Sequence, residues 1–178
     1  MIDFVNNKKS YSIFYYTIIT MENIEEKNMK YACEIAKTGV DNGFGPFACV
    51  ITDKDGSIIS EGNNMVTMTN DPTAHAEMVA IRNACKKIGS FKLTDCILYT
   101  SCEPCPMCLS AIYWARIDKI YYGNNRFDAN DIGFDDSFLY EELSREIGNR
   151  KIHMSRLCED YAKESFRKWA EKEEKIEY

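Results

Sequence analysis

Four stretches of the chain carry apolar residues at the three- and four-residue spacing of a helix that buries one face. In the second stretch Met78, Ile81, Ala84 and Ile88 follow this spacing, and Gly89 ends the run. The last stretch is highly charged and keeps only a narrow apolar stripe. The pattern predicts helices over residues 22–38, 74–88, 107–115 and 159–174.

Shorter runs of β-branched, aromatic and other apolar residues alternate with these helices and predict strands. The turn Lys54-Asp55-Gly56 joins the first two runs into a hairpin. The stretch 123–136 is polar and predicts irregular structure, and a last strand is expected close to the C-terminus. Strands are expected over residues 47–52, 57–61, 96–100, 119–122 and 152–157. The order of elements predicts an α/β protein in which helices and a sheet form layers.

Length, composition and charge indicate one globular domain and disfavour a nucleic-acid-binding or membrane protein. The chain has 178 residues, of which 45% are hydrophobic and 28% charged, as in an ordinary globular domain. Residues 1–20 are interpreted as an N-terminal extension, which is either a mis-assigned translation start or a disordered segment, because Met21 opens a helix-like segment. A single domain is expected over residues 21–178. A net charge of −6 disfavours non-specific binding to nucleic acid, and no apolar run approaches the ~20 residues of a membrane helix. We expect a cytoplasmic protein.

Two short segments carry the candidate chemistry. The first reads His75-Ala76-Glu77, and the second reads Pro104-Cys105-Pro106-Met107-Cys108. Together they form the H-x-E and P-C-x-x-C signature of zinc-dependent nucleoside and nucleobase deaminases. Cys105 and Cys108 lie three apart at a predicted helix start, which puts both sulfurs on one face and favours their thiolate forms. With His75 they supply three ligands, leaving a fourth position for water as in a catalytic zinc site.

Glu77 lies two residues after His75, close to the predicted metal without being a required ligand. Its expected role is general acid and base: it takes a proton from water and passes it to a ring nitrogen and then to the leaving amine.

Other interpretations of the cysteines remain open. Cys105 and Cys108 could form a thioredoxin-like redox pair, and Cys102 could complete a structural zinc site. A zinc-binding scaffold without activity is a further alternative, although Glu77 argues against it. A ferredoxin-type cluster fails because Ile112 stands where a fourth cysteine is needed. The remaining cysteines are expected to be small core residues: Cys33, Cys49, Cys85, Cys96 and Cys158.

Residues 70–77, 99–108 and 133–138 together resemble the cytidine-deaminase-like superfamily and, within it, the small bacterial guanine deaminases. The zinc motifs indicate only the superfamily, and the last of these stretches, Gly-Phe-Asp-Asp-Ser-Phe, is what points to the guanine deaminases within it. The resemblance implies a three-layer α/β/α sandwich with a mixed five-stranded sheet and one zinc ion per subunit. It also implies hydrolysis of guanine to xanthine and ammonia in purine salvage or catabolism, by a homodimer whose C-terminal segment is swapped onto the partner.

The resemblance also implies roles for five further residues. Asn64 would hydrogen-bond the purine, Phe47 would pack on it, and Asp136 would assist recognition and proton transfer. Trp114 would form part of the pocket wall, and Tyr178 of the swapped tail would close the active site of the partner subunit. Each also has a simpler interpretation: an Asx turn for Asn64, a loop acid or helix cap for Asp136, core packing for Phe47 and Trp114, and a frayed end for Tyr178.

Rival substrates remain within the superfamily. A tRNA adenosine deaminase shares both half-motifs, but it needs a positive surface for RNA phosphates, and this chain carries a net charge of −6. Cytosine, cytidine and other amino-heterocycles are further alternatives.

Overall fold

The computed structural model describes residues 23–177. Its helices are α2 (Ile24–Asp41), α3 (Val66–Thr69), α4 (Ala76–Ile88), α5 (Pro106–Trp114), α6 (Arg126–Asp131), α7 (Ser137–Ser144) and α8 (Glu159–Glu171), with a short 3-10 turn η1 (Ile147–Asn149). Its strands are β1 (Ala48–Asp53), β2 (Ile58–Asn63), β3 (Cys96–Cys102) and β4 (Lys119–Asn124).

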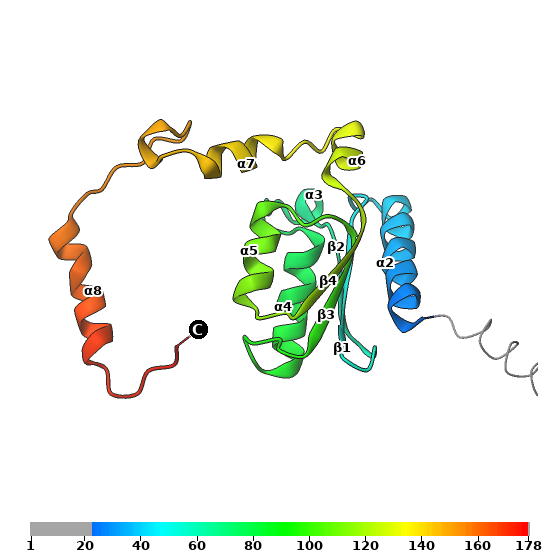
Figure 1. Cartoon of the computed structure of the whole chain (residues 1–178), viewed down its shortest axis with the longest axis horizontal. Coiled ribbons are helices and arrows are strands. Elements are labelled where there is room, and N and C mark those ends of the chain that lie inside the picture. The colour runs from blue at the N-terminus through cyan, green and yellow to red at the C-terminus, as the bar shows by residue number, and fades with distance from the viewer. Residues whose placement is uncertain (1–22, 178) are drawn as a thin grey trace, which may run out of the picture.

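The strands form one mixed sheet in the order β2-β1-β3-β4. Strand β1 is antiparallel to both β2 and β3, whereas β3 and β4 are parallel. Helix α2 covers one face of this sheet, and α4 and α5 cover the other (Figure 1). The predicted α/β/α layers and the mixed sheet are therefore confirmed.

The number of strands is corrected from five to four among the described residues. The segment 152–157, predicted as the last strand, forms no strand in residues 23–177, because a strand needs a hydrogen-bonded neighbour and this segment lies apart from the sheet (Figure 1). The stretch 123–136 is not irregular throughout, since it contains α6. A capping box starts this helix: the Asn125 side chain accepts from the backbone of Asp128, whose carboxylate accepts from the Asn125 backbone N–H.

Each face of the sheet buries its own apolar cluster. Toward α4 and α5, Cys49, Ile51 and Leu98 pack with Ala80 and Ile112. Toward α2, Val50 and Tyr99 pack with Ala32. Side chains alternate between the two faces along β1 and β3, as strand geometry requires.

Two of the predicted core cysteines are not in the core. Cys49 and Cys96 are buried and Cys85 is half-buried, but Cys33 and Cys158 are exposed. Cys33 directly follows the buried Ala32, so it is turned by about 100° from the helix face that packs on the sheet. Cys158 precedes α8, which has no buried residue.

Gly62 of β2 allows the close approach of α4 to the sheet. A Cβ at Gly62 would lie 2.5 Å from the Ala76 carbonyl oxygen and 2.7 Å from the Ala80 nitrogen, both backbone atoms. Gly62→Ala is therefore expected to lower the free energy of unfolding by about 1–3 kcal/mol, measured by urea denaturation. In Gly148→Ala the added Cβ meets nothing within 4 Å, so this control should change stability by less than about 0.5 kcal/mol. Equal midpoints for the two variants would contradict the packing argument.

The residues from Arg145 to the end of the described chain form what we call the C-terminal arm. It extends away from the three layers, with α8 at a distance from the sheet (Figure 1). Apolar side chains of the arm are exposed, among them Tyr161 at 84% and Phe166 at 79%. The proposed extension 1–20 and Tyr178 lie outside the described residues. Within residues 23–177, no helix is both long and apolar enough to cross a membrane.

Candidate metal centre and active site

The first turns of α4 and α5 meet at one end of the sheet. His75 is the N-cap residue of α4, and Cys105 is the N-cap residue of α5, followed by Pro106 in the first turn. Proline suits this position because it lacks the N–H that the first turn leaves unpaired. Both helices start directly after extended backbone, so the sequence positions of the two half-motifs bring their side chains to one point.

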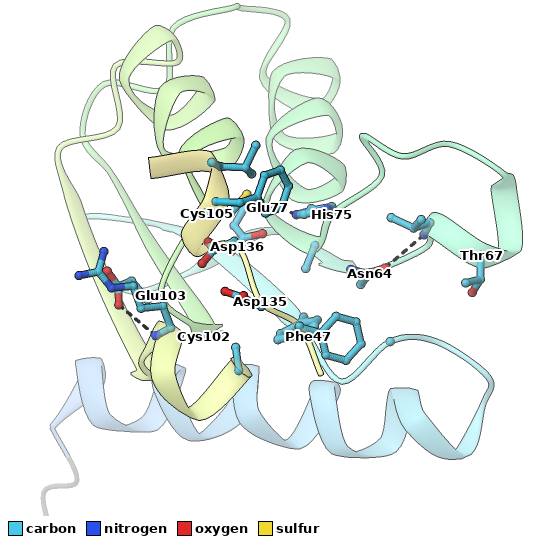
Figure 2. Close-up of a pocket in the computed structure, with 18 residues that line it drawn as sticks. Phe47, Asn64, Thr67, His75, Glu77, Cys102, Glu103, Cys105, Asp135 and Asp136 are labelled. Carbon is cyan, nitrogen blue, oxygen red and sulfur yellow. Dashed lines mark hydrogen bonds between the residues drawn. The ribbon is translucent and has the colours of Figure 1, made fainter. Parts of the chain in front are cut away.

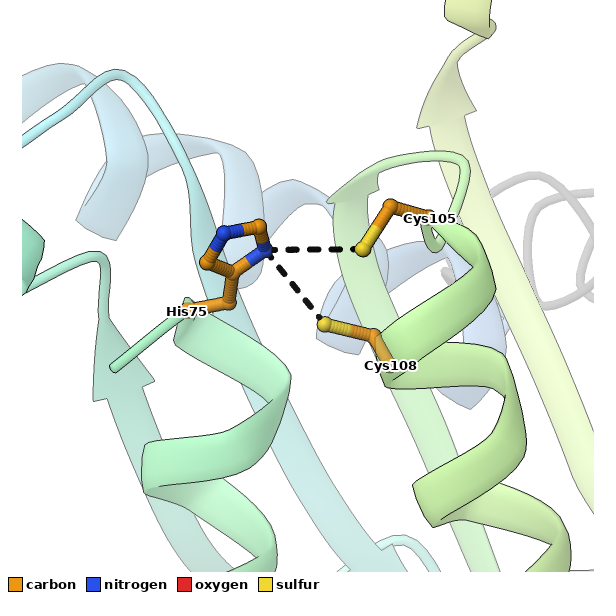
Figure 3. A group of neighbouring side chains, drawn as sticks. All are labelled: His75, Cys105 and Cys108. Atoms are coloured by element: carbon orange, nitrogen blue, oxygen red, sulfur yellow. Dashed lines mark hydrogen bonds between the residues drawn. The ribbon is translucent and has the colours of Figure 1, made fainter. Parts of the chain in front are cut away.

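His75, Cys105 and Cys108 form a compact donor set (Figure 3). Nδ1 of His75 lies 3.6 Å from Sγ of Cys105 and 3.5 Å from Sγ of Cys108. Two ligands of a tetrahedral zinc ion, one nitrogen and one sulfur, lie about 3.5 Å apart at the usual bond lengths. One imidazole and two sulfurs are also the donor chemistry that zinc prefers. The three residues therefore fit a zinc ion with one position left open, as predicted.

The protonation of the cysteines favours metal binding. The pKa of Cys105 is lowered to about 4, because the Cys108 thiol donates a hydrogen bond to it and His75 lies beside it. The pKa of Cys108 is raised, mainly because it holds the proton shared with Cys105. Without a metal, the pair thus carries one thiolate and one thiol, and binding a metal to both sulfurs releases the remaining proton.

Glu77 lies in the first turn of α4, beside the donor set, and is 6% exposed. Burial is the main cause that raises the pKa of its carboxyl group. The Thr100 hydroxyl donates a hydrogen bond of 2.9 Å to Oε1 of Glu77. A carboxylate with a raised pKa next to a metal-binding set is suited to accept a proton and to return it.

A cavity of about 400 Å³ opens over the metal-binding residues (Figure 2). Most of the site residues that were predicted from the sequence line this cavity. Its lining includes Phe47, Asn64, His75, Glu77, Cys102, Glu103, Cys105, Arg126, Phe134, Asp135 and Asp136.

Phe47 and Asn64 lie on the wall of the cavity that is built by the start of β1 and the end of β2. The Phe47 ring meets Phe134 edge to face, with 4.9 Å between ring centroids. The Asn64 Oδ1 atom accepts from the Val66 backbone N–H, which is the expected Asx turn. This bond fixes the Asn64 side chain through its oxygen and leaves its amide nitrogen as the donor that can serve a ligand.

The neighbouring acids Asp135 and Asp136 have different roles. Asp135 Oδ1 accepts from the Ser137 backbone N–H at the start of α7. Asp136 is the N-cap residue of α7 but makes no capping hydrogen bond with its side chain. Burial is the main cause that raises the pKa of Asp136. The simple capping interpretation therefore fits Asp135, and Asp136 contributes its carboxylate to the cavity.

Among the described residues, Trp114 does not line this cavity. Trp114 is 60% exposed at the end of α5. The residues that α5 buries are Cys108 and Ile112, and a residue two positions after Ile112 is turned about 200° from it. Tyr178 lies outside the described residues.

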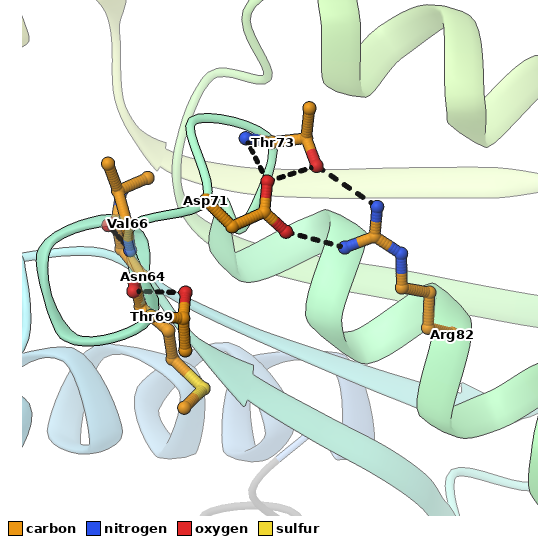
Figure 4. A network of polar contacts seen from close by, with 7 residues as sticks. Asn64, Val66, Thr69, Asp71, Thr73 and Arg82 are labelled. Carbon is orange, nitrogen blue, oxygen red and sulfur yellow. Dashed lines mark hydrogen bonds and ion pairs between the residues drawn. The ribbon is translucent and has the colours of Figure 1, made fainter.

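The loop that leads into His75 is held by its own polar contacts (Figure 4). Oδ1 of Asp71 accepts from the backbone N–H of Thr73 at 2.8 Å and from the Thr73 hydroxyl at 2.7 Å. Arg82 of α4 donates to the Thr73 hydroxyl at 3.1 Å. These bonds tie the loop to α4, the helix that follows it.

Some residues of the cavity were missed in the sequence. Arg126 follows β4, and its guanidinium carbon lies 4.8 Å from the centroid of the Tyr140 ring. Oε2 of Glu103 accepts from the Arg126 backbone N–H. Arg126 lies in the stretch predicted to be irregular, and the N-x-x-D pattern of Asn125 and Asp128 was the signal that could have placed it at a helix start.

Cys102 is not part of the donor set found among the described residues. Its Sγ atom lies 3.7 Å from the carbonyl oxygen of Asn125. Burial raises the pKa of its thiol to about 11, so it stays protonated at neutral pH. Because Cys102 lies outside this donor set, the arrangement favours packing over metal binding for its sulfur and argues against a structural site with four protein ligands.

Comparisons with known proteins agree with this geometry. Residues 22–124 match the cytidine and deoxycytidylate deaminase zinc-binding region. The chain is 50% identical over 154 residues to guanine deaminase of Bacillus subtilis, which covers 86% of this chain and 98% of that protein. The crystal structure of a guanine deaminase from Bacillus subtilis superposes with a TM-score of 0.83 at 49% identity, over 86% of this chain and 98% of that one. A tRNA-specific adenosine deaminase of Haemophilus influenzae is 37% identical over 129 residues, covering 70% of this chain and 75% of that protein.

Proposed function

Because this chain belongs to the cytidine and deoxycytidylate deaminase family, we propose that it hydrolyses guanine to xanthine and ammonia with the help of zinc. One observation carries the proposal. A single cavity is lined by His75 and Cys105 of the zinc donor set, by the buried carboxylate of Glu77 and by groups suited to a purine. Cys108, which is buried, completes the donor set. The similarity to a guanine deaminase along 86% of the chain supports the choice of guanine.

His75, Cys105 and Cys108 would hold the zinc ion. When bound, zinc lowers the pKa of a water molecule to about 7, so that hydroxide is available at neutral pH. With two thiolates and one imidazole as its protein ligands, a zinc ion would keep a fourth position for that water, as catalytic zinc sites do.

Glu77 moves the protons of the reaction. Its carboxylate accepts a proton from the attacking water and delivers it to a ring nitrogen of the base. The water oxygen bonds to C2 of the base. Glu77 then takes the remaining proton of that oxygen and supplies it to the 2-amino group, which leaves as ammonia when the C2–N bond breaks and the C2=O bond forms. The raised pKa of the buried carboxyl group supports both transfers, since a group with a pKa closer to the working pH both accepts and returns protons well.

Phe47, Asn64 and Asp136 orient the base. The N1–H and the 2-amino group of guanine are hydrogen-bond donors, and the Asp136 carboxylate is a suitable acceptor for them. The Asn64 amide nitrogen can donate to an acceptor on the purine ring, and the Phe47 ring offers an apolar contact to its plane. A site that matches polar groups in this way can reject analogues that lack them by about 10⁴-fold or more.

The test is the release of ammonia by the zinc-loaded protein from guanine, adenine, cytosine, cytidine, guanosine and a tRNA anticodon stem-loop, each measured separately. Activity on guanine is expected to exceed activity on every other substrate. Activity confined to the stem-loop would refute the proposal and favour a tRNA adenosine deaminase. The net charge of −6 argues against that outcome.

A domain-swapped homodimer accounts for the C-terminal arm. Helix α8 places Phe166 and Trp169 within one apolar stripe, yet no residue of this helix is buried. Exposed aromatic side chains also mark the ends of α5 and α6, including Trp114 and Phe127. A partner's arm would cover such surfaces, and Trp114 would then meet the partner rather than line its own cavity. In this arrangement Tyr178 closes the site of the other subunit.

Mixed dimers test the swap. One chain carries Glu77→Gln and a complete tail, and the other has an intact Glu77 but lacks residues 176–178; each alone is expected to be nearly inactive. Dimers containing one of each, co-expressed with two different tags and purified through both, are expected to reach about half of wild-type activity, because each holds one complete site. Mixed dimers as inactive as the parents, or full activity of the shortened chain alone, would contradict the swap.

The proposed setting is purine salvage or nitrogen release in the cytoplasm. None of the cysteines, which all lie within residues 23–177, forms a disulfide bond, and unpaired cysteines persist in a reducing compartment. Residues 21–178 are proposed to act as one deaminase domain, and residues 1–20 as an extension outside it.

A further inference from the structure

Thr100 is a polar exception on the face of β3 that packs against α4 and α5. The neighbours on the same face are Cys96, Leu98 and Cys102, all of them buried. Thr100 itself is 1% exposed. Valine has nearly the same shape and is equally suited to a strand, so packing alone does not explain a hydroxyl group here. A buried hydroxyl is unfavourable unless it forms a hydrogen bond.

The hydroxyl of Thr100 has its partner in Glu77. It donates to Oε1 over 2.9 Å, within the buried part of the site. The backbone of Thr100 is held on both sides, because Thr100 pairs with Cys49 of β1 and with Tyr122 of β4. The donor is therefore fixed to the centre of the sheet, while Glu77 comes from the first turn of a helix.

This bond restricts the orientation of the Glu77 carboxylate. The last torsion of a glutamate side chain is broad, so packing restricts it poorly. A hydrogen bond of 2.9 Å to one oxygen limits that freedom, and hydrogen bonds to a charged group are stronger than neutral ones. With Oε1 bound to Thr100, Oε2 is the oxygen that can face the attacking water.

We propose that Thr100 is a positioning residue: its hydroxyl orients the carboxylate of Glu77 so that Oε2 faces the reacting water. The proposal rests on the proposed function, in which Glu77 moves the protons. It adds a residue that acts on the rate through Glu77 and does not touch the base.

Thr100→Val is the test variant, and Thr100→Ser is the rescue. With guanine, Thr100→Val is expected to lower kcat about 10- to 100-fold, because a misdirected proton acceptor loses the benefit of orientation. KM should change by less than about twofold and zinc should remain at one per chain, since the cavity and the metal ligands are untouched. Thr100→Ser keeps the hydroxyl and should recover most of kcat.

Thr52→Val is the matched control. Thr52 lies on β1, is as buried as Thr100, and donates its hydroxyl to the carbonyl oxygen of Asp53. This variant makes the same chemical change on the opposite face of the sheet, so any loss of stability should be similar while kcat stays near the wild-type value.

Several results would overturn the proposal. These are a wild-type kcat in Thr100→Val, a Thr100→Ser variant no better than Thr100→Val, a loss of zinc that matches the loss of activity, or an equal loss in Thr52→Val. Wild-type protein that binds zinc but does not deaminate guanine would instead refute the proposed substrate. The same four proteins would then be compared on whichever base the wild type does deaminate, with the same expectations for Thr100.

Discussion

Glu77→Gln is expected to keep its zinc and to lose about 10³- to 10⁴-fold in kcat for guanine. Glutamine has nearly the same shape and can still accept the hydrogen bond that Thr100 donates to Oε1. It cannot take up a proton at neutral pH, so both the activation of water and the protonation of the leaving amine lose their carrier. The change should therefore appear in the rate and not in the fold.

The measurement combines steady-state kinetics with zinc analysis and a thermal melt of the same samples. Glu61→Gln is the matched control, because Glu61 lies on β2 outside the cavity, where it accepts a hydrogen bond from Tyr31. The control should retain wild-type activity. A Glu77→Gln enzyme that turns over guanine at the wild-type rate would show that another group carries the protons.

Cys105→Ser is expected to lose both zinc and activity. Serine replaces a thiolate whose pKa is about 4 by a hydroxyl that stays protonated at neutral pH, so one of three metal ligands disappears. After dialysis against metal-free buffer, zinc should fall well below one per chain, and activity should fall at least about 10³-fold. Metal analysis and kinetics on the same preparation would check this.

Cys33→Ser serves as the control, since Cys33 is an exposed cysteine of α2 and lies outside the donor set. It should keep wild-type zinc and activity. In the wild type, a chelator should expose two additional reactive thiols without any reductant. Thiols that become reactive only after reduction would instead indicate a redox pair at Cys105 and Cys108.

The metal-binding residues could be predicted from the sequence because their geometry is local. His75 and Glu77 lie within one helix turn, as do Cys105 and Cys108, and His75 and Cys105 are the N-cap residues of their helices. Only the contact between the two helix starts had to be learned from the fold. The alternation of helices and strands already indicated that helices would form a layer on the sheet.

Predictions that depended on distant partners were less successful. Residues 152–157 have strand-like composition, but a strand exists only where a neighbour pairs with it, and the sequence does not name that neighbour. Trp114 was assigned to the pocket wall by resemblance; in the single chain it is exposed and lies outside the cavity, so its role depends on a partner subunit and stays a prediction. Helix α6 was not predicted because its capping box, Asn125 and Asp128, lies within a polar stretch that has no apolar periodicity.

The positions of the three donors also bear on stability. His75 begins one helix and Cys105 begins another, and the chain between them includes all of α4 and β3. An ion held by both ends closes this loop, much as a covalent cross-link would, and so reduces the entropy that the unfolded chain can gain. Part of the free energy of metal binding then becomes folding free energy. The ion that serves the reaction therefore also holds the first turns of α4 and α5 together. The stability of this end of the molecule then rises with the concentration of free zinc.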